Sequence, residues 1–315
     1  MLHGPDPVHA VRLLHHLQLF PAVFMLPPSI GGHLGGDFAT AGTELLAAAH
    51  ALLDSWSKEV SFTQEEKRQC VLAAAMLPVR HIKLSGGKGK PKSASAHVIR
   101  ESLKWKAKDC EAVDSLHTSA PQLLEVWQAL QGLGGAVDEK SVPAETRVAL
   151  GRCIRQLKNL WQAGCILASL LPTPEARPLG APEDPSEAKE ALASPRALQD
   201  PAAATADGAE AAAVGSSSNG DGGLHAGGPR AARLEMCRSL LAAAEAFGIA
   251  DCWHWKPVLD GKQVMAAMGM EKGGPALRLL MDRVLDWQLC HPHGTAEECR
   301  QYLQANFSGT ADMQR

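Results

Sequence analysis

Apolar residues recur at intervals of three and four through two blocks of the sequence, residues 1–171 and 233–306. Between Leu45 and Trp56, for example, they fall at positions that form one broad face of a helix. Aromatic residues make up only 4% of the chain, whereas all-β folds rely on aromatic and β-branched side chains. The sequence therefore predicts an all-α fold, a helical array made of a body and a tail.

The stretch between the blocks, residues 172–232, is rich in Pro, Ala, Gly and Ser and has no aromatic side chain. It carries nine acidic and four basic residues, so its net charge is −5. Such a segment cannot bury enough apolar surface to offset the entropy lost on ordering. We expect a long disordered insertion here, between a helical body at 1–171 and a helical tail at 233–306, with a flexible C-terminus at 307–315.

Several local signals predict where helices begin and end. The spacing of a capping box occurs twice, at Thr63 with Glu66 and at Thr295 with Glu298. Thr43 follows a glycine-rich stretch at 31–36, which is predicted to be a loop, and is itself a predicted N-cap. Further predicted boundaries are helix starts at Pro121, Pro143 and Pro275 and helix ends at Gly248 and Gly269.

The cysteines and the apolar runs exclude two classes of protein. Eight cysteines without a C-x-x-C pair, in a chain of 315 residues, do not resemble a disulfide framework, so we interpret them as reduced thiols, mostly in the core. No apolar run approaches the roughly 18 residues that a membrane span needs. The N-terminus has neither a signal peptide nor a transit peptide pattern. We expect an intracellular protein.

The strongest chemical signal is a basic segment between residues 80 and 108, in a chain whose net charge is −3. Its only acidic residue is Glu101, and its cations are Arg80, Lys83, Lys88, Lys90, Lys92, Arg100, Lys104, Lys106 and Lys108. Arg100, Lys104 and Lys108 are four residues apart, so we expect them on one helical face, where like charges repel by about 0.2–0.5 kcal/mol per pair. This pattern favours a polyanionic partner, such as a phosphate backbone, over the alternative of a solvated lysine-rich face.

A second candidate for anion binding lies at residues 268–275, Met-Gly-Met-Glu-Lys-Gly-Gly-Pro. A glycine-rich turn before a proline-opened helix presents free backbone N–H groups, and Lys272 stands beside them. Lys262 opens the preceding helix. The alternative is an ordinary connection between two helices.

A group of cysteines and histidines near the C-terminus does not predict a metal site. Residue types that bind zinc occur close together at Cys290, His291, His293 and Cys299. Pro292 separates the two histidines and the cysteines form no C-x-x-C pair, which disfavours a metal site.

No G-x-S-x-G, H-E-x-x-H or D-x-D motif is present, so we identify no catalytic residues. Asp109 and Glu111 are two positions apart and are expected on a solvated helix face. Tryptophans at 105, 253, 255 and 287 could stack on bases, although Trp287 and Trp127 are expected in the core.

An ordered series of motifs near the C-terminus carries a resemblance. It comprises D-G-K at 260–262, W-Q-L at 287–289 and H-P-H-G-T-A-E-E-C at 291–299. This series resembles the tail of the CCA-adding tRNA nucleotidyltransferase and poly(A) polymerase family, especially its eukaryotic, plant-type branch. Residues 17–27 and the basic stretch 92–109 resemble the body of the same family.

The resemblance implies a division of labour. Members of this family have a head, a neck, a body and a tail, and the head binds two metal ions through G-G-x-x-R-D and D-x-D motifs. The neck pairs with CTP or ATP through E-D-x-x-R. None of these three motifs is found here, and G-G-H-L-G-G-D at 31–37 departs from the head pattern. Met1 falls roughly where the family's body begins, so a truncated gene product or half of a split enzyme is expected, inactive alone.

The resemblance also implies partners and binding residues for this chain. The resemblance implies tRNA as the partner, with no cofactor in this chain because Mg2+ and CTP or ATP would bind the absent head. The family occurs in nucleus, cytoplasm, mitochondrion and plastid, so the compartment stays open. The predicted RNA-binding residues are Lys88, Lys90, Lys92, Arg100, Lys104, Lys106, Lys108, Lys262, Lys272, Gly273 and Gly274. The alternatives kept open are a separate head polypeptide as a further partner, and a non-catalytic helical scaffold that binds protein.

Overall fold

The structure, a computed structural model, describes residues 2–84, 91–133, 142–172 and 229–307. The predicted disordered insertion lies almost wholly outside these ranges. Lys88 and Lys90, together with the predicted flexible C-terminus beyond residue 307, lie outside them as well.

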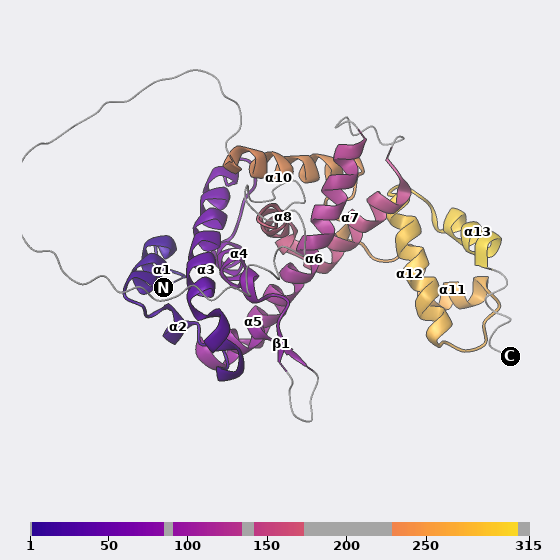
Figure 1. The fold of residues 1–315 in the computed structure, drawn as a ribbon. Coiled ribbons are helices and arrows are strands. Elements are labelled where there is room, and N and C mark those ends of the chain that lie inside the picture. The colour runs from indigo at the N-terminus through magenta and orange to yellow at the C-terminus, as the bar shows by residue number, and fades with distance from the viewer. Residues whose placement is uncertain (1, 85–90, 134–141, 173–228, 308–315) are drawn as a thin grey trace, which may run out of the picture. The chain divides into compact units, whose positions relative to one another are not determined.

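The described residues form helices with a single pair of two-residue strands, which confirms the predicted all-α class (Figure 1). The α-helices are α1 Pro7–His16, α2 Phe20–Val23, α3 Pro28–Trp56, α4 Gln64–Met76, α5 Ala94–His97, α6 Ala107–Gly132, α7 Ala144–Leu157, α8 Trp161–Ser169, α10 Pro229–Ala246, α11 Gly261–Ala267, α12 Pro275–Cys290 and α13 Ala296–Phe307. Short 3-10 turns are η1 Leu77–Val79, η3 Lys158–Leu160 and η4 Cys252–His254, and η2 Val98–Ser102 is a π-helical turn. The strands β1 Lys83–Leu84 and β2 Lys92–Ser93 pair antiparallel.

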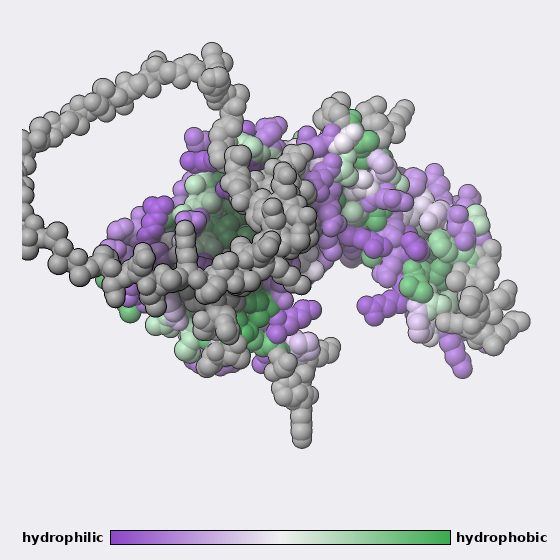
Figure 2. Space-filling model, in the orientation of Figure 1, coloured by the Kyte–Doolittle hydropathy of each residue, from purple (hydrophilic) through white to green (hydrophobic). Residues whose placement is uncertain are grey.

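Helices α3, α4, α6, α8 and α10 enclose most of the larger hydrophobic core, called here the body core. Its largest fully buried side chains include Trp56 and Trp161. Helix α10 follows the undescribed stretch in sequence but packs on α8 and also contacts α3 and α6 (Figure 1). Trp127 lies half-buried at the edge of this core rather than inside it. Figure 2 shows hydrophilic side chains over most of α6 and α7 in this view.

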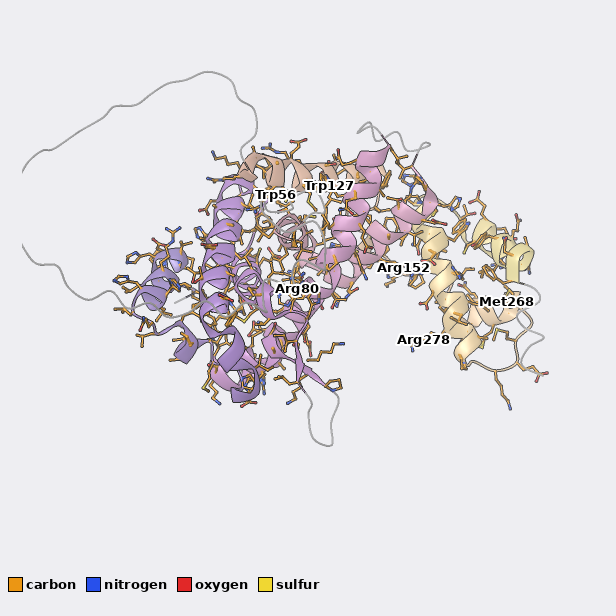
Figure 3. The ribbon with its side chains drawn as sticks, in the orientation of Figure 1. Trp56, Arg80, Trp127, Arg152, Met268 and Arg278 are labelled. Atoms are coloured by element: carbon orange, nitrogen blue, oxygen red, sulfur yellow. The ribbon has the colours of Figure 1, made fainter. Side chains whose placement is uncertain are left out.

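Helices α11, α12 and α13 enclose a second, smaller core, called here the tail core. Its buried members are Leu259, Val264, Met268, Leu280, Val284, Trp287, Cys299 and Leu303. The predicted core position of Trp287 is therefore confirmed. Met268, labelled in Figure 3, closes the C-terminal end of α11 over this core.

Helix α7 contacts both η4 and α12. Arg152, labelled in Figure 3, makes a bidentate ion pair with Asp286, with N–O distances of 2.7 and 2.6 Å. Gly151 allows Leu289 of α12 to approach, because a Cβ on this glycine would lie 2.9 Å from Leu289 Cδ1 and closer still to Cδ2. Leu289 thereby joins the body core, although the rest of α12 belongs to the tail core.

Both predicted capping boxes are confirmed. The Thr63 N–H donates to Glu66 at 2.8 Å, and the Thr295 N–H donates to Glu298 at 2.7 Å. The predicted helix ends at Gly248 and Gly269 are confirmed too, since both adopt φ of +65°, which glycine tolerates best. Pro143 precedes α7 and Pro275 opens α12, as predicted.

The predictions for Thr43 and Pro121 were wrong. Helix α3 begins at Pro28 and runs through the glycine-rich stretch, so Thr43 lies inside it and its hydroxyl donates to the Ala39 carbonyl at 2.7 Å. Pro121 lies inside α6, not at its start. In each case burial of neighbouring side chains outweighs a local helix-breaking preference: Phe38 is buried beside the glycines of α3, and Leu123 is fully buried in α6.

All eight cysteines are free thiols, and seven of them are buried. The interpretation of these residues as mostly core thiols is therefore confirmed for their position, with half-exposed Cys290 as the exception. Among the described helices, we find none with the length and apolarity required to cross a bilayer.

Candidate nucleic-acid interface

The basic segment is not one helix. It passes from β1 and β2 through α5 and the π turn at 98–102, then leaves right-handed helical geometry at Lys104, whose φ is +57°. Helix α6 starts afresh at Ala107. The prediction that Arg100, Lys104 and Lys108 share one helical face was therefore wrong, because Lys104 itself is left-handed and interrupts the helix between Arg100 and Lys108.

The segment Lys104–Lys108, called here the basic turn, forms the N-terminal approach to α6. Its backbone is held from both sides: the Trp105 N–H donates to the Ile99 carbonyl at 2.9 Å, and Arg100 Nη1 donates to the Trp105 carbonyl at 3.1 Å. Arg100 therefore stabilises the turn as well as adding a charge near it.

The buried ion pair between Arg68 and Asp109 supports the basic turn. Asp109 accepts the Lys106 backbone N–H at 3.2 Å and an ion-pair hydrogen bond from Arg68 of α4. Both charged side chains are only 4% exposed. The expectation that Asp109 lies on a solvated face was wrong, because Arg68 approaches from a helix forty-one residues earlier in the chain. Sequence reasoning missed Arg68, and the spacing of Lys106 and Asp109 as N-cap and N3 was the available signal.

The carboxylate of Glu65 connects this ion pair to the surface. Glu65 accepts from Arg68 Nη2 at 2.8 Å and pairs with Lys108 Nζ at 3.1 Å. The hydrogen bond with Arg68, supported by Lys108, lowers the pKa of Glu65 to about 2, so this carboxylate is ionised at neutral pH. At the other end of the turn, Lys104 Nζ lies 3.7 Å from Glu101. Lys104, Lys106 and Lys108 are all exposed.

Trp105 lies in the middle of the basic turn and is half-buried. The guanidinium of Arg68 lies 4.5 Å from the centroid of its ring, a cation–π contact. The hollow beside it has a volume of about 330 Å³. It is lined by His3, Glu65, Arg68, Lys104, Trp105, Lys106, Lys108 and Asp109. Three exposed lysines around the N-terminus of a 26-residue helix form a surface suited to anionic groups.

The remaining cations of the basic segment take different positions. Lys92 is exposed on β2, and the following Ser93 donates to Asp114 of α6 at 2.7 Å, which fixes the strand pair to α6. Arg80 is half-buried in the body and its Nη1 donates to the Leu77 carbonyl at 3.2 Å (Figure 3). Arg80 is therefore a structural residue rather than a surface charge.

The second predicted contact, at Lys262, Lys272, Gly273 and Gly274, lies at the start of α11 and α12. Both lysines are exposed. Gly261 and Gly273 both lie next to the side chain of Leu277. A Cβ added to Gly261 would be 3.7 Å from Leu277 Cδ2, and one added to Gly273 would be 3.2 Å from the same atom. The start of α11 therefore lies beside the glycine-rich turn. Arg278, one turn into α12, is exposed and points away from α11 (Figure 3), a cation that sequence reasoning missed.

The loop after α12 brings aromatic and polar side chains together. The ring of His291 stacks on Trp287 with centroids 4.6 Å apart and planes 17° apart. A pocket of about 450 Å³ lies here, lined by Trp287, Cys290, His291, Pro292, His293, Gly294 and Glu298. Cys299 is buried in the tail core instead. Within the described ranges, no group of three or more His, Cys, Asp and Glu side chains is arranged to hold a metal ion.

A comparison with known proteins finds a partial similarity. Fifty-five residues, 18% of this chain, are 46% identical to the tRNA nucleotidyltransferase cca2 of Schizosaccharomyces pombe. The aligned part covers 11% of that protein, so the chain matches only a small share of this relative's length. No family model matches the chain, and no solved structure matches it. The similarity supports a relationship to CCA-type tRNA nucleotidyltransferases, the family that the sequence motifs resemble.

Proposed function

We propose that this chain is the tRNA-binding body and tail of a CCA-adding tRNA nucleotidyltransferase of the plant-type branch. Such enzymes transfer nucleotides from CTP and ATP to the tRNA 3′ end with loss of pyrophosphate. The motif series at 260–299 and the 46% identity to cca2 support the family. The observation that carries the binding role is the basic turn, whose exposed lysines stand on a rigid support of buried charges.

The basic turn suits a phosphate backbone for two reasons. Its lysines can each neutralise one phosphate and release condensed counterions, which makes affinity depend steeply on salt. Its backbone is held by Asp109 and Arg100, so little conformational entropy is lost when a ligand binds. We propose that Lys92 belongs to the same surface, and Lys88 and Lys90, which lie outside the described residues, stay predicted members of it.

We propose a second phosphate contact at Lys262 and Lys272, with the Gly273 and Gly274 turn before α12. The N-terminus of this 16-residue helix adds a partial positive charge. Arg278 adds a further cation to the same end of α12. Two separate contacts fit a large folded nucleic acid better than a mononucleotide.

Nucleotide transfer itself is assigned to a head that this sequence does not contain. The D-x-D pair that would hold the two metal ions is absent from the sequence, and the described residues bring no metal-ligand group together. Mg2+ and CTP or ATP are therefore proposed to bind the head, which a separate polypeptide could supply. Purified chain should incorporate no labelled CTP or ATP into tRNA, and incorporation would contradict this division.

An apolar patch at the N-terminus favours a protein partner and keeps the scaffold function as a second candidate. Leu13, Leu17 and Leu19 are 46%, 53% and 46% exposed. If these side chains form one contiguous apolar surface, they mark an interaction site. A head polypeptide would cover this patch. A pure scaffold would use the same patch but would bind its partner with little dependence on salt and would not bind tRNA.

The experiment that tests the binding role is a tRNA affinity measurement at several salt concentrations. Lys104→Glu with Lys108→Glu should flatten the slope of log affinity against log salt by roughly two units and weaken binding about 30-fold at 0.15 M salt. Lys58→Glu with Lys256→Glu changes the net charge equally at exposed positions elsewhere and serves as the control. An unchanged slope in the first double variant would remove the basic turn from the interface.

A further inference from the structure

The loop after α12 has a feature that phosphate binding does not use. We propose that His291, stacked on Trp287 and called here the His291 platform, binds one unpaired nucleobase of the RNA by stacking. This inference rests on the proposed function and adds a base-reading contact to it. The geometry of three groups carries it: the indole, the imidazole and the pocket in front of them.

The indole of Trp287 is a fixed support. It belongs to the tail core and is only 7% exposed. Gly294 of the following loop lies tightly against it, since a Cβ at this position would be 2.9 Å from Trp287 Cζ3 and closer to Cη2. The loop can therefore approach the ring only because residue 294 is a glycine.

The imidazole of His291 is oriented at two points. Its ring lies nearly parallel to the indole, and its Nδ1 lies 2.9 Å from the Trp287 carbonyl oxygen, the position of a donated Nδ1–H bond. One face of the imidazole is thus covered, while the residue as a whole is exposed. A flat, preoriented ring with an open side binds a base with little loss of side-chain entropy.

The pocket favours a base over a phosphate. Glu298 lines it, and the Thr295 N–H and hydroxyl hold the pKa of this carboxyl below its usual value, so a negative charge stands in the pocket. A carboxylate repels a phosphate but can accept a hydrogen bond from the exocyclic amine of adenine, cytosine or guanine. Pro292 adds apolar surface. The lining therefore fits the π-face and the amino edge of a nucleobase.

The test compares three substitutions at one position in the full chain. His291→Ala should weaken tRNA binding by about 5- to 150-fold and leave the salt slope unchanged, because stacking releases no counterions. His291→Phe should restore most of the affinity, since it keeps a ring without a charge. His291→Lys should not restore it. His9→Ala, at an exposed histidine of α1 that does not line this pocket, is the control.

A second measurement uses the unmodified protein. Cys290 lines the same pocket and is half-exposed, whereas the other seven cysteines are buried, so a maleimide should label Cys290 first. Burial raises the pKa of this thiol, so labelling is followed at mildly alkaline pH. A short single-stranded RNA should slow the labelling, and an abasic oligonucleotide of equal charge should not.

The outcomes separate the two proposals. Wild-type binding with no effect of His291→Ala would overturn the His291 platform and leave the proposed tRNA-binding function intact. A changed salt slope in His291→Ala, or equal protection of Cys290 by the abasic oligonucleotide, would also overturn the platform, because the site would then act through charge. Failure of the wild-type chain to bind tRNA at any salt concentration would overturn both proposals.

Discussion

The basic turn and the His291 platform both lie where a helix meets a loop, yet they are built by opposite means. The basic turn begins α6 and is held by charges, with Asp109 and Arg68 buried beneath exposed lysines. The platform ends α12 and is held by packing, with Trp287 fixed in the tail core against Gly294. The first suits phosphates and the second suits a base, so salt and substitution should affect the two surfaces differently.

The basic turn and the His291 platform should also differ in how much their side chains contribute to the stability of the fold. A buried ion pair is costly to break from one side, because the remaining charge loses its partner in a medium of low polarity. An exposed ring stacked on a buried one can be removed at smaller cost, since its own contacts are partly with solvent. Removing Asp109 should therefore damage the basic turn through unfolding, whereas removing the exposed His291 ring should weaken binding with little effect on stability.

The largest expected effect sharpens this contrast. Asp109→Ala leaves buried Arg68 with Glu65 as its one acidic partner among the described residues and removes the cap on the Lys106 N–H, so the free energy of unfolding should fall by about 3 kcal/mol. Urea unfolding measures it. Glu111→Ala, at an exposed position two residues on, should change stability by less than about 0.5 kcal/mol. Equal effects of the two substitutions would show that the ion pair does not support the turn.

Acid should weaken the helix behind the basic turn next. Burial lowers the pKa of His117 in α6 from 6.5 to about 4, and its Nε2 lies 2.8 Å from the Ala73 carbonyl oxygen. A depressed pKa means that the unfolded state takes up the proton first, so stability is full above pH 6.5 and falls by about 3 kcal/mol as the pH decreases to 4.

Urea unfolding of wild type and His117→Gln across this pH range provides the measurement. The variant should lose the dependence between pH 6.5 and 4.5, while both proteins keep a later loss of stability below pH 4.5, where Glu65, with its pKa lowered to about 2, is protonated first in the unfolded state. A wild-type profile that is flat between pH 6.5 and 4 would contradict the neutral, buried state of His117.

A substitution at Gly294 tests the support of the platform. Gly294→Ala places a methyl group against the rigid Trp287 ring, so the loop or the tail core must shift, at a cost of about 1–3 kcal/mol. Gly132→Ala, where no atom lies within 4 Å of the added methyl group, is the control and should be neutral or slightly stabilising. Thermal unfolding compares them, and equal midpoints would show that Gly294 is not tightly packed.

The smallest expected effect concerns the link between α7 and α12. Arg152 is 58% exposed and Asp286 is 14% exposed, so a double-mutant cycle with alanine at both positions should give a coupling of only about 0.5–1 kcal/mol. Packing of Leu289 against Gly151 and the hydrogen bond from Arg147 Nη1 to the Cys290 carbonyl also attach α12 to α7. A coupling above about 2 kcal/mol would show that this ion pair, rather than packing, joins the two helices.

Much of this arrangement follows from local sequence signals. Capping boxes, glycine helix ends and apolar periodicity predicted the helices because each depends on residues within one or two turns. The stack of His291 on Trp287 was also within reach, since residues four apart meet at the end of a helix.

The wrong sequence-based predictions have a common physical cause. The left-handed conformation of Lys104 and the burial of Asp109 depend on contacts from other elements, namely Arg68 of α4 and the π turn before the basic turn. The continuity of α6 through Pro121 depends on packing as well. A charge pattern with helical spacing therefore predicted exposed cations in this segment but not the path of its backbone.

The most direct test of the central claim is the salt dependence of tRNA affinity for the unmodified chain. If the three lysines of the basic turn contact phosphates, log affinity should fall against log salt with a slope of about −2.7 or steeper. A slope near zero, or no binding to tRNA at low salt, would contradict the account.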